Sequence, residues 1–213
     1  MSEVDGSDRL VAEHLRAGLE EGCRLGNELV VVEETRSTND LVWEAEARGA
    51  REGFVVFAEK QTAGRGQYGR RWESAPYQGL WFSVLLRPSL TVPESPQLTS
   101  LLATVLAATF AEETGCAAKI KAPNDIYMAG RKIAGVLVEG RTTADQNYVA
   151  VAGVGINVNQ ELYQFPFELQ ATAGSLRLVA GRPVDRSRLA LALLRKLDAH
   201  YRDFQAGLVA RNC

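Results

Sequence analysis

A short stretch rich in glycine and arginine carries residue types that bind anions. Residues 64–72 read Gly-Arg-Gly-Gln-Tyr-Gly-Arg-Arg-Trp and follow a strand-like run at residues 54–57. Glycine lets the backbone turn tightly and present its N–H groups to an anion, while arginine offers planar forks to carboxylate or phosphate. Taken alone, such a stretch is more often a solvated basic loop, because short glycine motifs match by chance. Other motifs must therefore decide between the two interpretations.

The stretch matches neither standard nucleotide-binding loop. No Lys-Ser or Lys-Thr pair follows a pair of suitably spaced glycines, which excludes a P-loop. No helical pattern with an acidic ribose ligand follows either, as a dinucleotide-binding fold requires. Instead, Trp72 is followed by Glu-Ser-Ala-Pro and then by an apolar run at residues 80–86, which predicts a second strand.

Three further motifs accompany this loop in a fixed order. Ser37-Thr38-Asn39 lies upstream, while residues 121–125 (Lys-Ala-Pro-Asn-Asp) with 131–135 (Arg-Lys-Ile-Ala-Gly), and then 153–157 (Gly-Val-Gly-Ile-Asn), lie downstream. In this order the four motifs resemble those of the biotin protein ligases, which activate biotin as its adenylate and attach it to a lysine of a carrier domain. The resemblance extends over most of the chain, from about residue 30 to about residue 204. Four ordered motifs are far more specific than one.

The fold that the resemblance implies is α+β, a mixed and mostly antiparallel sheet packed by helices, as in the biotin and lipoate protein ligases and class II aminoacyl-tRNA synthetases. Residue periodicity predicts the elements that position the motifs. Strands are expected at residues 29–34, 54–57, 80–86, 118–121, 126–128, 132–139 and 148–156. Helices are expected at residues 7–22, after Asn39 up to Gly49, and at 96–114 and 185–204. We expect an N-terminal helical extension at residues 1–28 and a catalytic domain at residues 29–213.

Composition limits the classes of function. A chain of 213 residues with 46% hydrophobic and 23% charged residues is typical of one globular core, and a net charge of −2 disfavours a protein built to hold nucleic acid. The three cysteines are far apart, which indicates neither a disulfide framework nor a zinc site. No apolar run reaches the ~20 residues of a membrane span, and the acidic N-terminus is no signal peptide. We expect a cytoplasmic protein without membrane or nucleic-acid partners.

The resemblance also implies roles for individual residues. Lys132, Arg65 and Arg70 are the candidate catalytic cations, with Lys121 as a further candidate. The nucleotide would meet Arg65, Arg70, Trp72, Asn124, Asp125 and Asn157, with Asp125 also the nearest acidic group for Mg²⁺. The residues implied to contact biotin are Ser37, Thr38, Asn39, Gln61, Gly64, Arg65, Gly66, Gln67, Lys132, Gly135, Gly153 and Gly155. Simpler interpretations stay open, because Ser37 or Thr38 suits a helix N-cap and Lys121 and Lys132 suit solvated strand positions.

The implied reaction has two steps. The biotin carboxylate attacks the α-phosphate of ATP and releases pyrophosphate, and then a lysine of a biotin carboxyl carrier domain attacks the adenylate and releases AMP. ATP with Mg²⁺ and biotin are therefore the expected co-substrates, and no tightly bound prosthetic group is needed. The oligomeric state is left open, and a homodimer is compatible with the sequence.

The sequence departs from the family pattern at several points. Gln67 stands where the family often has arginine, and Ala122 where it often has tryptophan. The chain leaves no room for a helix-turn-helix before Leu29 and ends at Cys213, so we expect neither the repressor function nor the small C-terminal domain of bacterial ligases. Two alternatives stay open: a lipoate or octanoate ligase or transferase of the same fold, and a non-catalytic protein that binds biotin or its adenylate.

Overall fold

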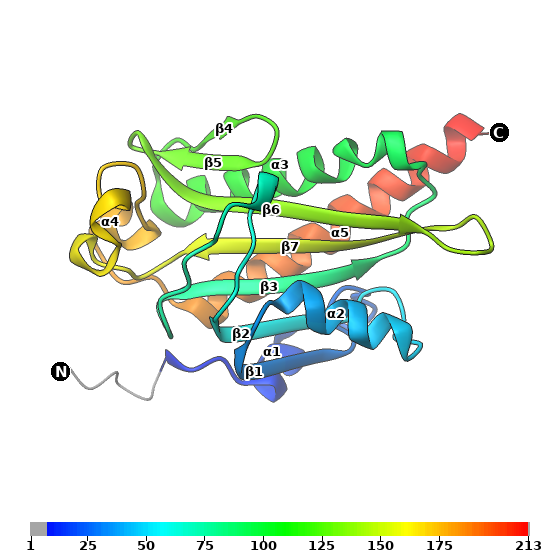
Figure 1. The fold of residues 1–213 in the computed structure, drawn as a ribbon, viewed down its shortest axis with the longest axis horizontal. Helices are drawn as coiled ribbons and strands as arrows, with labels where there is room; N and C mark the ends of the chain where they lie inside the picture. The colour runs from blue at the N-terminus through cyan, green and yellow to red at the C-terminus, as the bar shows by residue number, and fades with distance from the viewer. Residues whose placement is uncertain (1–7, 213) are drawn as a thin grey trace.

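A seven-stranded sheet forms the centre of the molecule (Figure 1). The computed structural model describes residues 8–212, with side chains up to residue 207. The strand order is β1-β2-β3-β7-β6-β5-β4, and only β1 and β2 pair in parallel within the described residues. The strands are β1 (Leu29–Thr35), β2 (Val55–Gln61), β3 (Gly79–Leu86), β4 (Lys119–Lys121), β5 (Asp125–Met128), β6 (Arg131–Thr142) and β7 (Tyr148–Asn157). This mixed, mostly antiparallel sheet confirms the expected fold class.

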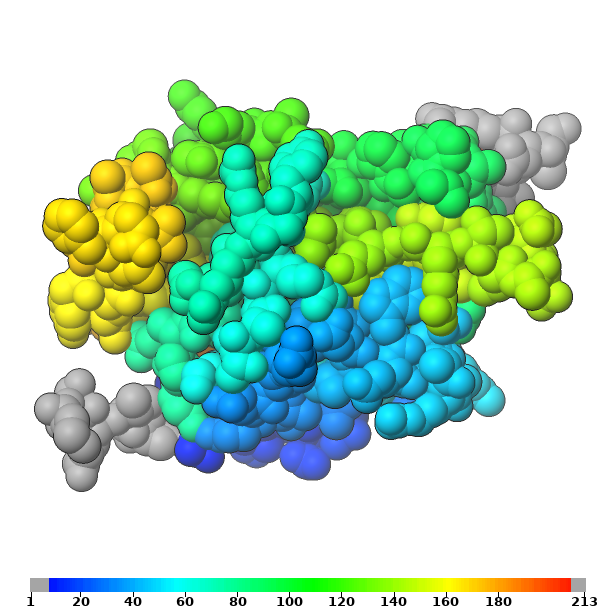
Figure 2. Space-filling view, viewed as in Figure 1, coloured from blue at the N-terminus to red at the C-terminus, as the bar shows by residue number. Residues whose placement is uncertain are grey.

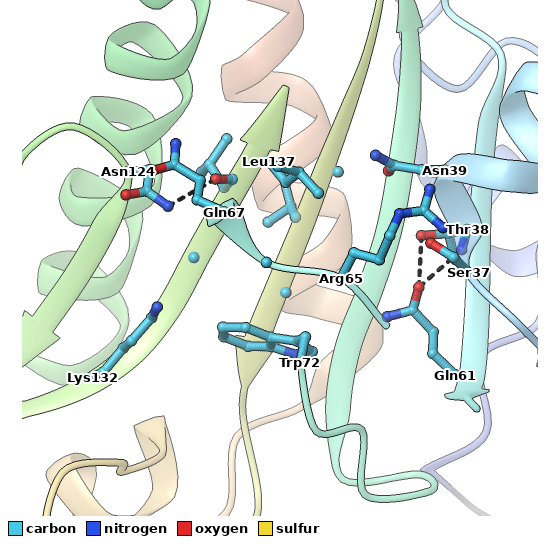
Figure 3. A pocket seen from close by; sticks show the side chains of 16 residues that line it. Ser37, Thr38, Asn39, Gln61, Arg65, Gln67, Trp72, Asn124, Lys132 and Leu137 are labelled. Atoms are coloured by element: carbon cyan, nitrogen blue, oxygen red, sulfur yellow. Dashed lines mark hydrogen bonds between the residues drawn. The ribbon is translucent and has the colours of Figure 1, made fainter. Parts of the chain in front are cut away.

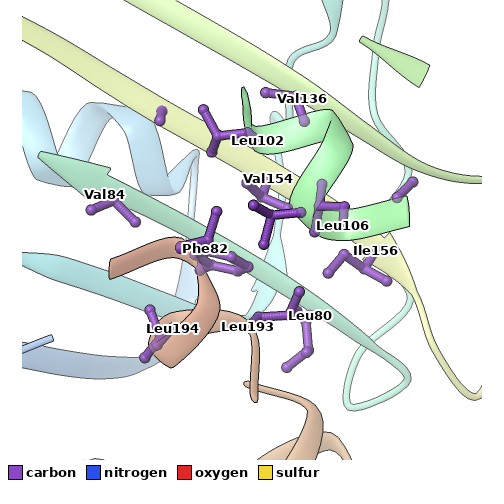
Figure 4. Close-up of a cluster of buried hydrophobic side chains, with 14 of the residues drawn as sticks. Leu80, Phe82, Val84, Leu102, Leu106, Val136, Val154, Ile156, Leu193 and Leu194 are labelled. Atoms are coloured by element: carbon purple, nitrogen blue, oxygen red, sulfur yellow. The ribbon is translucent and has the colours of Figure 1, made fainter. Parts of the chain in front are cut away.

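Two long helices, α3 (Pro96–Thr114) and α5 (Arg186–Asn212), cover one face of the sheet and lie behind the strands in Figure 1. Figure 4 shows the resulting core, in which their leucines meet alternate residues of the central strands. In β3 these are Leu80, Phe82 and Val84, because successive side chains of a strand point to opposite faces. Burial of this apolar surface is the main stabilising term of the fold.

The opposite face of the sheet carries α2 (Thr38–Ala47) and, beside it, the glycine–arginine loop, residues 64–72. Beneath α2, Val42 packs with Val56, Leu85 and Val151 in a second, smaller cluster. Figure 2 shows the loop raised across this face of the molecule. All residues of β3 are buried because the strand is covered on both faces, which explains why its run is apolar except for Ser83.

The N-terminal helix α1 (Ala12–Gly18) is shorter than the helix predicted at residues 7–22. Residue 7 lies outside the described residues, as does the acidic N-terminus. The helix begins after Val11, because Val11 is extended and the N–H of Leu10 bonds to Glu59 Oε1 at 2.8 Å. Leu10 and Leu15 enter the main core. The segment from residue 8 to residue 28 therefore packs directly on the domain that it was expected to precede.

A buried ion pair fastens this segment to the centre of the molecule. Arg186, at the start of α5, is fully buried, and its NH1 lies 2.7 Å from Glu59 Oε2. The same guanidinium contacts Asp8 and donates to the carbonyl of Gly79 at 3.0 Å. Because Glu59 is only 2% exposed, both charges depend on these partners instead of water.

Two other differences from the predicted elements are small. The helix expected at residues 185–204 continues to Asn212, and the short helix α4 (Leu176–Ala180) was not predicted. The hairpin of β5 and β6 turns at Ala129 and Gly130 as expected, both with positive φ. Among the described residues, every helix is too short or too polar to cross a membrane.

Candidate active site

A polar pocket lies between the start of α2, the glycine–arginine loop and strands β6 and β7 (Figure 3). We call it the first pocket; it is narrow in this structure, with a cavity volume of about 40 Å³. Every predicted biotin-contacting residue except Gly64 lines it. Its lining is Ser37, Thr38, Asn39, Gln61, Arg65, Gly66, Gln67, Trp72, Asn124, Lys132, Gly135, Val136, Leu137, Gly153, Val154 and Gly155. Residues far apart in the sequence thus meet in one cavity.

The start of α2 supplies hydrogen-bonding groups to the first pocket. Ser37 occupies the N-cap position as expected, but its hydroxyl makes no capping hydrogen bond. Instead, Gln61 Oε1 accepts the N–H of Thr38 at 2.8 Å and lies 3.2 Å from its hydroxyl. The Ser37 hydroxyl thus remains available to the pocket, and Gln61 acts as a support of α2.

Ser83 lies beneath this turn and was not predicted as a site residue. Its hydroxyl is 2.6 Å from both Thr38 Oγ1 and Asn39 Oδ1, and the side chain is fully buried. Asn39 Nδ2 is buried and has no hydrogen-bond partner among the described residues. A buried amide donor without a partner is costly, and a ligand oxygen in this pocket would satisfy it. In the sequence, the only sign that Ser83 belongs to the site is that it is a single serine within the apolar run of β3.

The glycines of β6 and β7 make room for two side chains of the site. Gly135 and Gly155 are paired across the two strands, and a Cβ at Gly155 would lie 2.5 Å from the Trp72 indole. A Cβ at Gly135 would meet the same ring at 3.1 Å, and one at Gly153 would overlap the Asn39 amide. These glycines line the pocket as predicted, and they also let Trp72 lie flat against the sheet.

Arg65 is held by two carboxylates. Its NH2 lies 2.7 Å from Asp40 Oδ1 and 3.3 Å from Glu139 Oε1. The hydrogen bond to Asp40, together with the charge of Glu139, raises the pKa of Arg65 above its already high ordinary value. Neither carboxylate was predicted from the sequence, because no local pattern connects them to the loop.

Lys132 lies where the first pocket meets a second one. Its Nζ is 2.7 Å from Asp125 Oδ1 and 5.3 Å from the centre of the Trp72 ring. Its backbone is fixed as well, since its N–H donates to Thr172 O at 2.8 Å and its carbonyl accepts from Gly174 N at 3.0 Å. The ammonium group is therefore anchored by an ion pair, an aromatic face and two backbone bonds.

The second pocket is larger, with a cavity volume of about 390 Å³. It shares Gly66, Gln67, Trp72, Asn124 and Lys132 with the first pocket, so the two cavities adjoin. Of the predicted nucleotide residues, Arg70, Trp72, Asn124, Asp125 and Asn157 line it, while Arg65 lines only the first pocket.

The two asparagines of the second pocket are already partly engaged. Asn157 Nδ2 donates to Gly174 O at 2.9 Å and its Oδ1 accepts from Gln160 at 3.2 Å. Asn124 Nδ2 donates to Val136 O at 3.1 Å. Both side chains therefore shape the pocket wall, and only their remaining hydrogen-bonding capacity is available to a ligand.

Two predicted residues are not brought into either cavity. Lys121 is exposed on β4, with its Nζ 5.5 Å from the centre of the Tyr127 ring, and it lines a separate hollow. The short strand β4 at the edge of the sheet places it outside both pockets, which disfavours a catalytic role. Gly64 lies at the base of the loop, where a Cβ would come within 2.8 Å of Trp72 O, and so it supports the pocket without lining it.

A segment with no regular pattern completes the second pocket. Phe165, Leu169, Thr172 and Ala173 line it from a stretch of two short 3-10 helices, Leu162–Gln164 and Phe167–Leu169. Arg131 ties the segment to β6 by donating to the carbonyl oxygens of Gln170 and Ala173. In the sequence, only the aromatic residues of this stretch could have indicated that it lines a pocket.

The site does not fit a resident metal ion. Within the described residues, no group of three or more histidine, cysteine or acidic side chains could hold one. Asp125 is paired with Lys132, and Glu73 lies 3.0 Å from Arg71 Nε. One paired carboxylate is too little for an all-protein magnesium site, although it is compatible with an ion that arrives on phosphate oxygens.

Residues 31–157 match the biotin/lipoate A/B protein ligase family. The chain belongs to this family. A bifunctional ligase/repressor BirA of Bacillus subtilis is 37% identical over 196 residues, covering 92% of this chain and 60% of the relative. A biotin–acetyl-CoA-carboxylase ligase of Mycobacterium tuberculosis is 38% identical over 182 residues, covering 81% of this chain and 63% of the relative. The chain thus spans about three fifths of the length of these relatives.

The fold agrees with this assignment. The biotin protein ligase of Aquifex aeolicus, solved in complex with biotin and ATP, superposes with a TM-score of 0.73 at 31% identity. The match covers 84% of this chain and 72% of the Aquifex chain. The family domain therefore includes the loop, both motif-bearing hairpin strands and the floor of the two pockets.

Proposed function

We propose that this protein is an ATP-dependent biotin ligase of the cytoplasm that transfers biotin to a lysine of a biotin carboxyl carrier domain. The observation that carries the proposal is the position of Lys132, a fixed cation at the boundary of two adjoining cavities. Joining a carboxylate to a phosphate requires two anions to meet, and a preorganised cation between them lowers that barrier. The names of the relatives supply the substrate class.

In this proposal biotin occupies the first pocket. Its ureido ring needs both donors and acceptors, which the Ser37 hydroxyl and the buried Asn39 Nδ2 provide. The carboxylate then extends toward Lys132 under the glycine–arginine loop. Gln61 has a mainly supporting role, since its Oε1 is occupied by Thr38.

ATP occupies the second pocket, where Trp72, Phe165 and Leu169 offer apolar surface to the base. The exposed guanidinium of Arg70 is available to its phosphates, as Arg65 is to the acyl phosphate. Asp125 would be the nearest carboxylate to a Mg²⁺ ion carried on the nucleotide phosphates, and such an ion would offset part of their charge. Asp125 thereby has a second role, which is to hold the Lys132 ammonium in place.

The reaction follows from this arrangement. A biotin carboxylate oxygen forms a bond to the α-phosphorus as the bond to the pyrophosphate oxygen breaks, and Lys132 offsets the charge that accumulates. The neutral amine of the acceptor lysine then attacks the acyl carbon of the adenylate. AMP leaves, the amine loses a proton, and no bond to the enzyme is formed.

The deciding experiment measures pyrophosphate release from ATP and Mg²⁺ with biotin, with lipoate and with octanoate. We expect release with biotin alone, increased by a carrier domain that accepts the product. Release with lipoate or octanoate would identify another acyl substrate of the family. Tight biotin binding without any release would identify a binding protein.

A further inference from the structure

The glycine–arginine loop is folded on itself, and its last residue, Trp72, anchors one end of it against Gly135 and Gly155 of the sheet. It forms a small hairpin, in which Trp72 N donates to Gly64 O at 2.9 Å and Gly66 N donates to Arg70 O at 2.7 Å. At its tip, Tyr68 is 89% exposed and has a positive φ of 59°. These bonds shape the hairpin, but they do not fix its position over the sheet.

The side chain of Arg65 connects the loop to two other elements of the fold. Asp40 lies in the first turn of α2, and Glu139 lies on β6 opposite Val151 of β7. In Figure 3 the Arg65 side chain runs from the loop toward the start of α2. The two carboxylates therefore bind the loop from a helix and from a strand that both border the first pocket.

One of the two carboxylates, Glu139, is itself held in place. Glu139 Oε2 accepts a hydrogen bond from Trp43 Nε1 at 3.1 Å, so its orientation is fixed by α2. Arg65, Asp40 and Glu139 are 38%, 38% and 30% exposed, which leaves the pairs partly shielded from water. Because the two carboxylates lie on a helix and a strand, they can fix the direction of the Arg65 guanidinium more precisely than partners on a loop could.

One end of the guanidinium remains available. Within the described residues, Arg65 uses Nε and NH2 for Glu139 and NH2 for Asp40, and no hydrogen bond involves NH1. We infer that Asp40 and Glu139 are positioning residues, which dock the loop through Arg65 and leave NH1 free for an anionic ligand. The ligand part of this inference rests on the proposed function, and the docking part does not.

The test uses the whole protein without ligand and trypsin, which cuts after arginine. Asp40→Asn combined with Glu139→Gln removes both charges and keeps the shapes of the side chains. Asp40→Glu keeps the charge, and Glu44→Gln is the matched control, because Glu44 is on the same helix and pairs with Arg48 at 3.4 Å. Mass spectrometry counts cleavage after Arg65, Arg70 and Arg71.

We expect the double variant to be cut in the loop roughly fivefold to tenfold faster than the parent, with cleavage elsewhere and melting temperature unchanged. Asp40→Glu and Glu44→Gln should behave as the parent. Raising the salt from about 0.05 M to about 0.5 M should accelerate loop cleavage of the parent more than that of the double variant, because salt screens the ion pairs.

Equal loop cleavage in the parent and the double variant at low salt would overturn the inference. If the double variant melts early, the salt dependence of the parent decides, and a parent without salt dependence would overturn the inference as well. In the ligase assay, the double variant should have a KM for biotin at least about threefold higher than that of the parent, while its kcat changes less than about twofold. If the parent shows no ligase activity, the proposed function fails while the cleavage result still decides the docking.

Discussion

Lys132 is the side chain on which the proposed chemistry depends most. Replacing it with alanine should reduce pyrophosphate release at least a hundredfold, because a fixed cation facing developing charge contributes roughly 3 to 4 kcal/mol. The melting temperature should change by only a few degrees, since Lys132 and Asp125 are both partly exposed. The measurement is initial pyrophosphate release at saturating biotin and ATP.

Lys121 provides the matched control for this experiment. It is a lysine of the neighbouring motif, but it lies on β4 outside both pockets. Lys121→Ala should therefore keep the parent rate to within about a factor of two, which is about 0.4 kcal/mol. A Lys132→Ala variant that keeps more than about a tenth of the parent rate, a loss under 1.4 kcal/mol, would remove Lys132 from the catalytic role.

Gln67 lines both pockets at the position where related ligases often carry arginine. A neutral amide can hydrogen-bond to an adenylate, but a charge-assisted bond is roughly twice as strong. We therefore expect this protein to release biotinyl-adenylate more readily than its Gln67→Arg variant. Each form is mixed with biotin, ATP and an unrelated lysine-rich protein, and the biotin on that bystander is quantified. Equal labelling would mean that the other arginines of the loop already supply the charge.

The glycine–arginine loop should behave as a lid that closes more tightly on ligands. Its glycines are costly to order, and the loop arginines repel one another until an anion arrives, while the Arg65 ion pairs offset only part of this cost. Adding biotin with ATP and Mg²⁺ should slow tryptic cleavage after Arg65 and Arg70 several-fold. Cleavage that is unaffected by the ligands would contradict a closing lid.

The elements that sequence periodicity predicted are those with strong local signals. β3 and β7 are long apolar runs, and α3 ends at Gly115, whose φ of 71° suits glycine. The stretch from Leu162 to Ala173 has no such period, and its last residues are held in place by long-range bonds from Arg131 and Lys132. It was therefore missed, although it forms one wall of the second pocket.

Most residues of the four motifs line the two pockets, and tertiary contacts bring in the other residues of the site. Asp40 and Glu139 are 25 and 74 residues from Arg65 in the chain, so no local pattern reveals that they meet. Ser83 belongs to the site only because strand alternation turns it toward α2. Sequence spacing thus identifies the groups proposed to react, but it seldom identifies the groups that position them.

At the level of the whole molecule, the buried pair of Glu59 and Arg186 joins the N-terminal segment, the sheet and α5. Glu59 accepts from Arg186 NH1 at 2.7 Å and from the N–H of Leu10 at 2.8 Å. Replacing Glu59 with glutamine leaves a fully buried guanidinium with only the partly exposed Asp8 as counter-charge, and breaking a buried pair from one side typically costs about 3 to 5 kcal/mol. We expect the free energy of unfolding, measured in urea, to fall by an amount in this range.

Glu34→Gln is the control for Glu59→Gln. It removes the same chemical group from an ion pair with Lys60, also at 2.7 Å, but both side chains are well exposed. Exposed pairs contribute about 0 to 1 kcal/mol, so the two variants should differ several-fold in their loss of stability. The losses are compared at equal m-value, because a changed slope would indicate a partly folded state instead of a simple loss of stability. If both variants lose less than about 1 kcal/mol, the N-terminal segment is held by the apolar packing of Leu10 and Leu15 and not by the buried charges.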